Sequence, residues 1–332
     1  MPALWCSWPV VLPWLAASLD FVIGDPWHWL HPVQVMGWAI QGYQHLVFKS
    51  VPSAGGQRWA GIALGLGLPG LSGAIAAALV IGAEYIHGGL ALAIAAIMLA
   101  SCLAARSLRR AAEDVLRPLQ QGDLTAARSQ LRLYVGRDTE HLSESEVLRA
   151  VMETISENAT DGVMAPLFYG LVGLAIAPAA GVGLAIAYKA LSTLDSMVGY
   201  RTAPYRQLGW FSARCEDFAT WLPCRLTVFT IALLSGHPRR VWQLCRRDAP
   251  ADPSPNAGWS ECAYAAALGV QLGGVNVYRG AVKPKPLLAE PLHPITMPLI
   301  AQGLRLTRWA VFSWLLVGSV LLAGRYMLSC AA

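Results

Sequence analysis

The sequence predicts an all-α, polytopic integral membrane protein that carries further helices and loops on its cytoplasmic face. The 332 residues are 55% hydrophobic and only 14% charged, and their mean hydropathy is +0.45, values typical of membrane proteins rather than soluble domains. Several apolar stretches reach the roughly 20 residues that a helix needs to cross a bilayer. Arginine and lysine gather between these stretches, as expected of cytoplasmic loops.

Four stretches are expected to span the membrane, namely 4–23, 59–82, 86–105 and 309–324. The first contains Pro9, Pro13 and Asp20, and it lacks the basic start and the small-residue cleavage site of a removable signal peptide. The second and third are rich in glycine and alanine, which suits close helix packing in lipid. Only a few residues separate these two stretches, so they predict a helical hairpin.

Two further apolar segments are harder to place. Residues 163–187 are long enough to span but contain Pro166 and Pro178. Residues 220–235 are short and contain Arg225, which costs about 2.5–3.5 kcal/mol at the centre of a spanning helix. We expect both segments to be re-entrant or buried without a full crossing, because other protein can cover polar backbone at membrane depth.

The distribution of basic residues orients these pieces. Arg106, Arg109 and Arg110 directly follow the third span, which places a helical insert at 106–162 in the cytoplasm. An arginine-rich polar loop region at 236–308 is expected on the same side. The sequence therefore predicts one membrane-embedded domain in the plasma (inner) membrane, with both termini outside. The net charge of +5 follows largely from these loops and does not indicate a nucleic-acid partner.

Common binding motifs are absent from the sequence. Seven cysteines are scattered without a C-x-x-C pair, so they predict neither a disulfide framework nor a zinc site. There is no P-loop and no G-x-G-x-x-G turn. The candidate chemistry therefore lies in the polar islands between the apolar stretches.

The most informative island is ETISENATD at 153–161. Glu153, Glu157 and Asp161 are four residues apart, so on a helix they share one face, with Asn158 beside them. Like charges at this spacing repel and weaken a helix unless a positive group faces them. Two interpretations stay open at this point: a solvated helix face with basic residues nearby, or a wall that binds a metal ion or another cation.

Four more polar islands accompany this stripe. Each alone is explained more simply as a cap or a turn. Five islands on one membrane face, with carboxylates and basic side chains in similar supply, favour a site for a phosphorylated, metal-bound ligand. Their candidate residues are Asp25 in 19–37; Arg137, Asp138 and Thr139 in 106–146; Lys189, Thr193, Asp195, Ser196, Arg214 and Asp217 in 188–221; and Ser254, Asn256 and Glu261 in 252–274.

Seven strings of the sequence resemble the blocks of one family. They are GDP at 24–26, HPVQVMG at 31–37, GRDT at 136–139, ETISENATDG at 153–162, YKALSTLDSMVGY at 188–200, GWFSARCED at 209–217 and SPNAGWSECAYAAALGVQLGG at 254–274. In this order they resemble the CobD/CbiB family of cobalamin biosynthesis, adenosylcobinamide-phosphate synthase. The similarity runs from about residue 19 to about residue 280.

The resemblance implies a membrane-bound, ATP-dependent amide synthase. Its substrates would be adenosylcobyric acid and (R)-1-amino-2-propanol O-phosphate, or free aminopropanol. Such an enzyme needs Mg²⁺ and cations at the reacting phosphates, and a base for the ammonium proton. On this basis the metal-ligand candidates are Glu153, Glu157, Asp161 and Asp195. The catalytic candidates are Lys189, Asp138 and Asp217, with the other residues named above as substrate- and phosphate-binding groups.

Two alternatives remain beside the enzyme. A transporter of a corrinoid or another anionic solute is favoured by Asp20, Arg225 and the interrupted 163–187 segment, although no inverted repeat accompanies them. A membrane scaffold or sensor is the other alternative, but it has no need of metal-ready carboxylates. The sequence leaves open whether the protein works alone, as a homo-oligomer, or in a complex with other enzymes of the pathway.

Overall fold

The computed structural model describes residues 8–24 and 31–331, with side chains up to residue 327. Within these ranges the chain is helical apart from one β-hairpin, so the predicted all-α class is confirmed. The chain forms two compact units, and each joins segments that are far apart in the sequence. The first comprises Met1–Ala104, Ala165–Thr220 and Trp314–Ala332, and the second comprises Ala105–Met164 and Trp221–Ser313.

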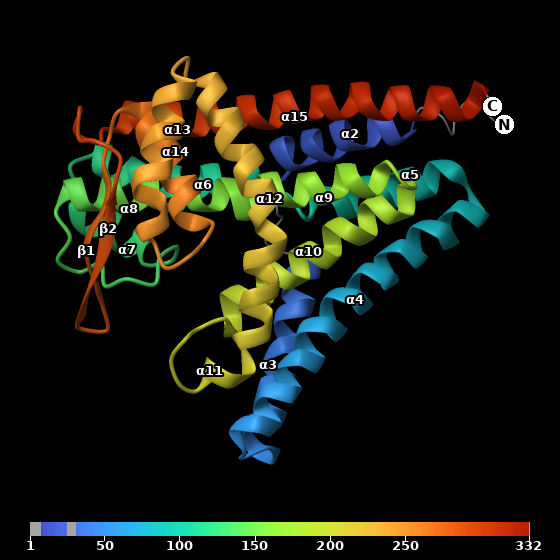
Figure 1. Ribbon diagram of the computed structural model, residues 1–332, viewed down its shortest axis with the longest axis horizontal. Helices are drawn as coiled ribbons and strands as arrows, with labels where there is room; N and C mark the ends of the chain where they lie inside the picture. The colour runs from blue at the N-terminus through green and yellow to red at the C-terminus, as the bar shows by residue number, and fades with distance from the viewer. Residues whose placement is uncertain (1–7, 25–30, 332) are drawn as a thin grey trace. The chain divides into compact units, whose positions relative to one another are not determined.

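The first unit is built from apolar helices. They are α2 (Trp8–Val22), α3 (Pro32–Ser50), α4 (Ala54–Ile86), α5 (Gly88–Ala100), α9 (Ala165–Leu174), α10 (Pro178–Val198) and α11 (Tyr205–Leu208), with the first part of α12 (Trp210–Leu234) and the last part of α15 (Met297–Ala331). α10 packs along α4 (Figure 1). A Cβ atom at Gly73 would lie 2.7 Å from the carbonyl oxygen of Gly183, so glycine permits this close crossing.

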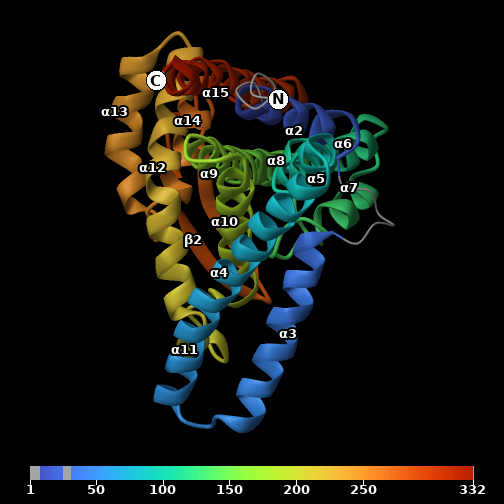
Figure 2. The same ribbon diagram turned by 90° about the vertical axis from the view of Figure 1, so that its right-hand side faces the viewer.

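The turn between α4 and α5 is formed by one residue. His87 ends α4, and its Nδ1 accepts the N–H of Gly89 at 3.1 Å in the first turn of α5. This break falls at the second residue of the predicted span 86–105, so α4 extends four residues beyond the predicted span 59–82. Figure 2 shows the preceding pair, α3 and α4, joined by the short loop at 51–53.

The second unit surrounds a polar region. Its elements are α6 (Ala105–Gln120), α7 (Leu124–Leu131), α8 (Glu144–Asn158), the π-helix η1 (Ala159–Met164), α13 (Pro238–Asp248), the 3₁₀-helix η2 (Ala249–Ala251), α14 (Ala257–Leu268), β1 (Leu272–Tyr278) and β2 (Ala281–Leu288), with the remaining parts of α12 and α15. Ser143 and Glu146 form a reciprocal capping box at the start of α8. The sequence pattern predicted this box.

The β-hairpin was not expected in the polar loop region. β1 and β2 pair in antiparallel, with Asn276 opposite Lys283 and Tyr278 opposite Ala281. The hairpin packs against α8, α13 and α14 (Figure 1). Pro284 and Pro286 lie inside β2, and proline within a short run usually argues against a strand.

Four helical stretches in the described residues are long and apolar enough to cross a membrane. They are Ala54–Ile86, Gly88–Gln120, Trp210–Leu234 and Met297–Met327; α2 is apolar but shorter. Residues 220–234 are therefore the second part of the long helix α12 rather than a short separate segment. Residues 163–187 form the end of η1, α9 and the first half of α10, joined by a turn at 175–177.

The side of the membrane on which 188–219 lies can be tested by cysteine labelling. We expect Thr202→Cys, at an exposed position, to resist a membrane-impermeant thiol reagent in intact cells, because the basic residues around it favour the cytoplasm. Tyr85→Cys, at the tip of the α4–α5 hairpin, should react readily and serves as the external control. Equal labelling at both positions would make this stretch external.

Candidate functional site

The candidate residues lie in both units, and each unit holds its own polar cluster. The second unit contains Arg137, Asp138, Thr139, Glu153, Glu157, Asn158, Asp161, Ser254, Asn256 and Glu261. The first contains Lys189, Thr193, Asp195, Ser196, Arg214 and Asp217. Asp25 lies outside the described residues.

Glu153 is the centre of a buried ion-pair cluster in the second unit. Arg137 donates to one carboxylate oxygen, and Arg149 Nη1 donates to the other at 3.1 Å. The N–H of Gly273 also donates to Glu153, at 3.0 Å. The Glu153 side chain is 2% exposed, while those of Arg137 and Arg149 are 8% and 13% exposed. Burial alone would raise the pKa of the Glu153 carboxyl, but the two guanidinium groups lower it below its usual range.

The two arginines also hold the β-hairpin. Arg149 donates to the carbonyl oxygens of Gly273 and Val275, at 2.7 and 3.1 Å. Arg137 donates to Oδ1 of the buried Asn276 at 2.9 Å. Glu153, predicted as a metal ligand, is thus brought together with arginines and strand backbone.

Asp138, predicted as a catalytic base, caps the turn of the hairpin. Its carboxylate accepts the N–H groups of Gly280 at 2.8 Å and Arg279 at 3.0 Å, and its own N–H donates to Val277 at 2.8 Å. The bonds from Gly280 and Arg279 lower the pKa of Asp138. A lowered pKa makes the carboxylate a weaker base, so this geometry favours a structural role.

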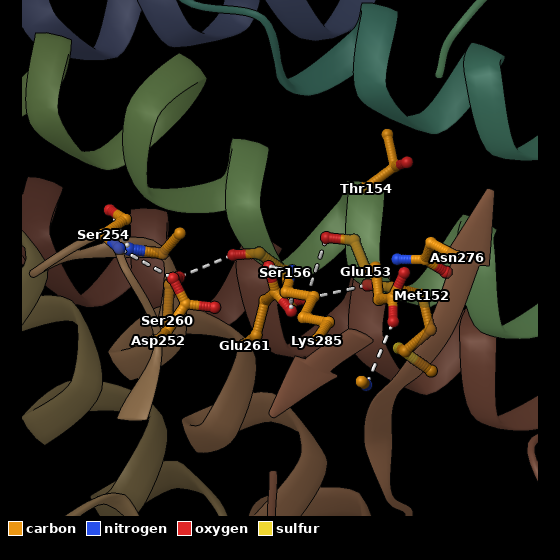
Figure 3. Close-up of polar contacts among 12 residues, drawn as sticks. Met152, Glu153, Thr154, Ser156, Asp252, Ser254, Ser260, Glu261, Asn276 and Lys285 are labelled. Atoms are coloured by element: carbon orange, nitrogen blue, oxygen red, sulfur yellow. Dashed lines mark hydrogen bonds and ion pairs between the residues drawn. The ribbon is translucent and has the colours of Figure 1, made fainter. Parts of the chain in front are cut away.

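Lys285 on β2 reaches the buried carboxylate of Glu261 on α14. Its Nζ donates to both carboxylate oxygens, at 2.5 and 2.7 Å (Figure 3). The Glu261 side chain is fully buried, and that of Lys285 is 22% exposed. Burial would lower the pKa of Lys285, but the carboxylates of Glu261, Glu153 and Glu157 outweigh it and raise that pKa. The lysine is therefore charged at neutral pH.

The loop at 252–257 is a fixed turn that begins α14. Ser254 Oγ accepts the N–H groups of Asn256 and Ala257, at 3.2 and 3.1 Å. Oδ1 of Asp252 accepts the N–H of Ser254 at 2.8 Å. Ser254 therefore fixes the turn that precedes α14, whose N-cap residue is Asn256.

Arg225, which was treated as an obstacle to a spanning helix, is well accommodated within the second unit. Its guanidinium lies 4.4 Å from the ring centroid of Trp259 and 5.3 Å from that of Trp221, and it donates to Asn256 Oδ1 at 3.3 Å. These contacts replace part of the hydration that the charge loses.

The rest of the carboxylate stripe follows Glu153 along α8 and η1. Glu157 is exposed to solvent, and Asp161 lies on the π-helix, a conformation that often occurs at functional sites. Asn158 donates to the carbonyl oxygen of Thr154 at 2.9 Å. Thr139 donates from its hydroxyl to a backbone carbonyl oxygen, at 3.0 Å. Among the described residues, no group of three or more acidic, histidine or cysteine side chains could hold a metal ion.

The first unit places a buried carboxylate near the predicted island at 188–221. Glu216 is 8% exposed and accepts a 2.5 Å hydrogen bond from Thr220, whose hydroxyl also bonds Tyr188 at 2.8 Å. The ring of Tyr188 stacks on that of Tyr169, with centroids 5.0 Å apart. The neighbouring Asp217 was predicted as a site residue from the sequence, whereas Glu216 was not.

The predicted lysine and hydroxyl residues of this island share α10. Thr193 donates to the carbonyl oxygen of Lys189 at 2.7 Å, and Ser196 donates to that of Thr193 at 2.9 Å. Asp195 lies on the same helix, and Arg214 is exposed on α12. These local bonds leave the predicted phosphate-binding role of the island untested.

The variant Lys189→Arg tests whether Lys189 anchors its helix at the membrane interface or binds a phosphate group. The change keeps the positive charge but replaces the compact ammonium group with the larger, planar guanidinium group. We expect a marked loss of amide synthesis, seen mainly as a higher KM for ATP or for the amine phosphate. Lys189→Met is the companion variant. If both variants retain wild-type kinetics, Lys189 only anchors the helix at the interface.

Gly273 is a sensitive point of the hairpin. Its φ is +88°, and a Cβ there would lie 1.9 Å from the carbonyl oxygen of Pro286. We expect Gly273→Ala to destabilise the protein by about 2–4 kcal/mol, from backbone strain and overpacking together. Gly280→Ala, at a φ of +76° with open space around it, should cost only about 1 kcal/mol. Thermal unfolding of the detergent-solubilised variants measures the difference, and equal losses would contradict the clash.

Several residues of the second cluster were not predicted from the sequence. They are Lys285, Asn276, Asp252 and the ion-pair role of Arg149. The available signal was the alternation KPKP at 283–286, in which prolines hold a lysine in an extended segment. The pairing of this segment with α14 has no local signal in the sequence.

Helical stretches able to span a bilayer and a buried cluster of acidic and basic side chains define a multi-pass membrane protein with a polar site. Residues 13–307 match the CobD/Cbib protein family. The chain belongs to this family, and therefore to the proteins of cobalamin biosynthesis.

The relatives cover most of the chain. It is 52% identical over 310 residues to "Cobalamin biosynthesis protein CobD" of Synechocystis sp., covering 93% of this chain and 90% of the relative. It is 41% identical over 301 residues to "Cobalamin biosynthesis protein CbiB" of Salmonella arizonae, covering 89% and 92%. It is 42% identical over 287 residues to the CobD protein of Geobacter metallireducens, covering 84% and 86%. No solved structure matches the chain.

Proposed function

We propose that this chain is an adenosylcobinamide-phosphate synthase, a ligase that forms an amide bond at the expense of ATP. It joins the free carboxyl of adenosylcobyric acid to (R)-1-amino-2-propanol O-phosphate, or to aminopropanol. The observation that supports this most directly is the convergence of the family blocks GRDT, ETISENATDG and SPNAGWSEC on one cluster in the second unit. We place the reaction on the cytoplasmic face of the inner membrane.

The chemistry requires an activated carboxyl and an uncharged amine. When bound, ATP with Mg²⁺ supplies the phosphoryl group that activates the carboxyl. A Mg²⁺ ion that arrives with a nucleotide needs only one or two protein carboxylates beside the phosphates. Asp161, on the π-helix, fits this role in the second unit, and Asp195 is the candidate in the first. Glu153 fits it poorly because both of its oxygens accept bonds from arginines and a backbone N–H.

The cations have separate tasks in this proposal. Lys189 binds a phosphate group in the first unit. Arg137 and Arg149 stabilise the hairpin that carries Lys285, and Lys285 neutralises the buried Glu261. The result is a cluster whose shape does not depend on the ligand, as preorganised electrostatic stabilisation requires.

The decisive assay measures ATP consumption by the purified protein in lipid nanodiscs. An amide synthase consumes ATP only when both the corrinoid acid and the amine are present, and forms amide in equal amount. A transporter would accumulate a corrinoid in vesicles without forming amide, and a scaffold would do neither. Absence of amide with both amines would reject the proposed function.

A further inference from the structure

Beside the paired carboxylates Glu153 and Glu261, two carboxylates of the second unit form no ion pair with a described residue. They are Asp252 and Glu157. Their neighbours are already neutralised, because Glu153 pairs with two arginines and Glu261 pairs with Lys285. Neither Asp252 nor Glu157 closes an ion pair with a described residue. The region therefore has room for positive charge that the chain itself does not supply.

Asp252 is held in an orientation suited to accept a proton. Its Oδ1 is fixed by the N–H of Ser254 at 2.8 Å, whereas its Oδ2 is buried and has no hydrogen-bond partner. The carboxylate packs on the start of α14, where a Cβ at Gly258 would lie 2.5 Å from the Asp252 Cβ. A buried acceptor without a donor calls for an explanation, and a ligand that brings an N–H group is one.

Glu157 is kept close to this loop by hydrogen bonds on both sides of it. Ser260 of α14 donates to the carbonyl oxygen of Ser156 at 2.5 Å, and its hydroxyl lies 2.7 Å from that of Thr160. Asp252 packs against Gly258, which lies two residues before Ser260 on α14, and Figure 3 shows the residues of this region. The carboxyl groups of Glu157 and Asp252 interact electrostatically across this contact.

We propose that Asp252 and Glu157 form the subsite for the ammonium group of the amine substrate, and that Oδ2 of Asp252 takes its proton. This inference rests on the proposed amide synthesis. The ammonium R–NH₃⁺ gives one proton to the Asp252 carboxylate and becomes R–NH₂. The amine nitrogen then forms a bond to the activated carboxyl carbon, the bond from that carbon to the phosphate oxygen breaks, and the second N–H proton leaves with the phosphate.

The surrounding charges favour an ammonium over a metal ion. Glu157 of α8 interacts electrostatically with Asp252, and Glu153 of α8, Glu261 of α14 and Lys285 of β2 interact with Glu157 in turn. Lys285 is charged, so a divalent ion beside it would meet strong repulsion. A monovalent ammonium meets less repulsion from Lys285 than a divalent ion does, and it supplies the hydrogen-bond donors that Oδ2 lacks.

The test compares two nucleophiles in Asp252→Asn. Asparagine keeps the Oδ1 acceptor for Ser254 but cannot take a proton. With the amine substrate at neutral pH, we expect a rate loss of about 10²–10⁴. The remaining rate should rise about tenfold for each pH unit, because only the free amine reacts. Hydroxylamine is largely uncharged at neutral pH and needs no base, so hydroxamate formation from adenosylcobyric acid and ATP should stay within about threefold of wild type.

Companion variants separate the possible outcomes. Glu157→Gln should raise KM for the amine while leaving hydroxamate formation intact, and Glu144→Gln, at an exposed position on the same helix, should change neither. Loss of both reactions in Asp252→Asn with an unchanged melting temperature would assign Asp252 to ATP or metal binding and overturn the inference. Wild-type rates with the amine would overturn it as well. If the wild-type protein itself forms neither amide nor hydroxamate, the proposed function fails instead.

Discussion

Glu153→Ala is expected to destabilise the protein by about 3–5 kcal/mol. The change leaves Arg137 and Arg149 as buried charges without a counter-ion and removes the acceptor of the Gly273 N–H. Breaking a buried ion pair from one side has this cost because the remaining charge is already removed from water. The measurement is thermal unfolding of the detergent-solubilised protein, together with amide synthesis, which should fall with the loss of the hairpin.

A surface pair provides the matched control. Arg132 and Glu140 lie 3.6 Å apart, with side chains 72% and 71% exposed. Solvent screens such a pair, so Glu140→Ala should cost no more than about 1 kcal/mol. If the two glutamate variants melted at the same temperature, the buried cluster would not be the support of the hairpin.

Asp161→Asn is expected to reduce amide synthesis by about 10²–10³ while the protein stays folded. In our proposal Asp161 binds the Mg²⁺ of the nucleotide, and removing a charged group from a reacting phosphate has an effect of this size. The partly exposed π-helix position tolerates the isosteric amide without a large change in packing. Initial rates at saturating ATP, compared at several Mg²⁺ concentrations, give the measurement.

The control for Asp161 is another helix-associated aspartate. Asp123 caps α7 by accepting the N–H of Ala126 at 2.8 Å, and asparagine is an equally good cap. Asp123→Asn should therefore keep both rate and stability. Near-normal turnover in Asp161→Asn would leave the stripe as a solvated helix face and remove this residue from the metal site.

Much of the fold followed from hydropathy and local pattern. The apolar stretch at 59–82 lies within α4, most of that at 86–105 forms α5, and the capping box at Ser143 is present. The β-hairpin was not predicted because Pro284 and Pro286 lie in its second strand, and proline usually argues against a strand. The long helix α12 was missed because Arg225 was judged by its cost in lipid, whereas Trp259 and Trp221 stack on it.

The candidate site was predicted less well, and the reason is distance along the chain. The sequence shows that Glu153, Glu157 and Asp161 share a helical face, but it does not show what faces them. Arg137 and the hairpin reach Glu153 from 16 and 120 residues away. No sequence pattern signals such long-range pairings. From the sequence the three carboxylates therefore look equivalent, although in the structure Glu153 is fully paired.

The prolines of β2 have a consequence for solubility during membrane insertion. A two-stranded hairpin exposes free edges, and such edges can pair with the strand of another molecule. Pro284 and Pro286 have no N–H to donate, and the exposed Lys283 repels a second copy of the same strand. The hairpin is thereby protected against intermolecular strand addition in newly made chains. Its two prolines act as a built-in safeguard against aggregation.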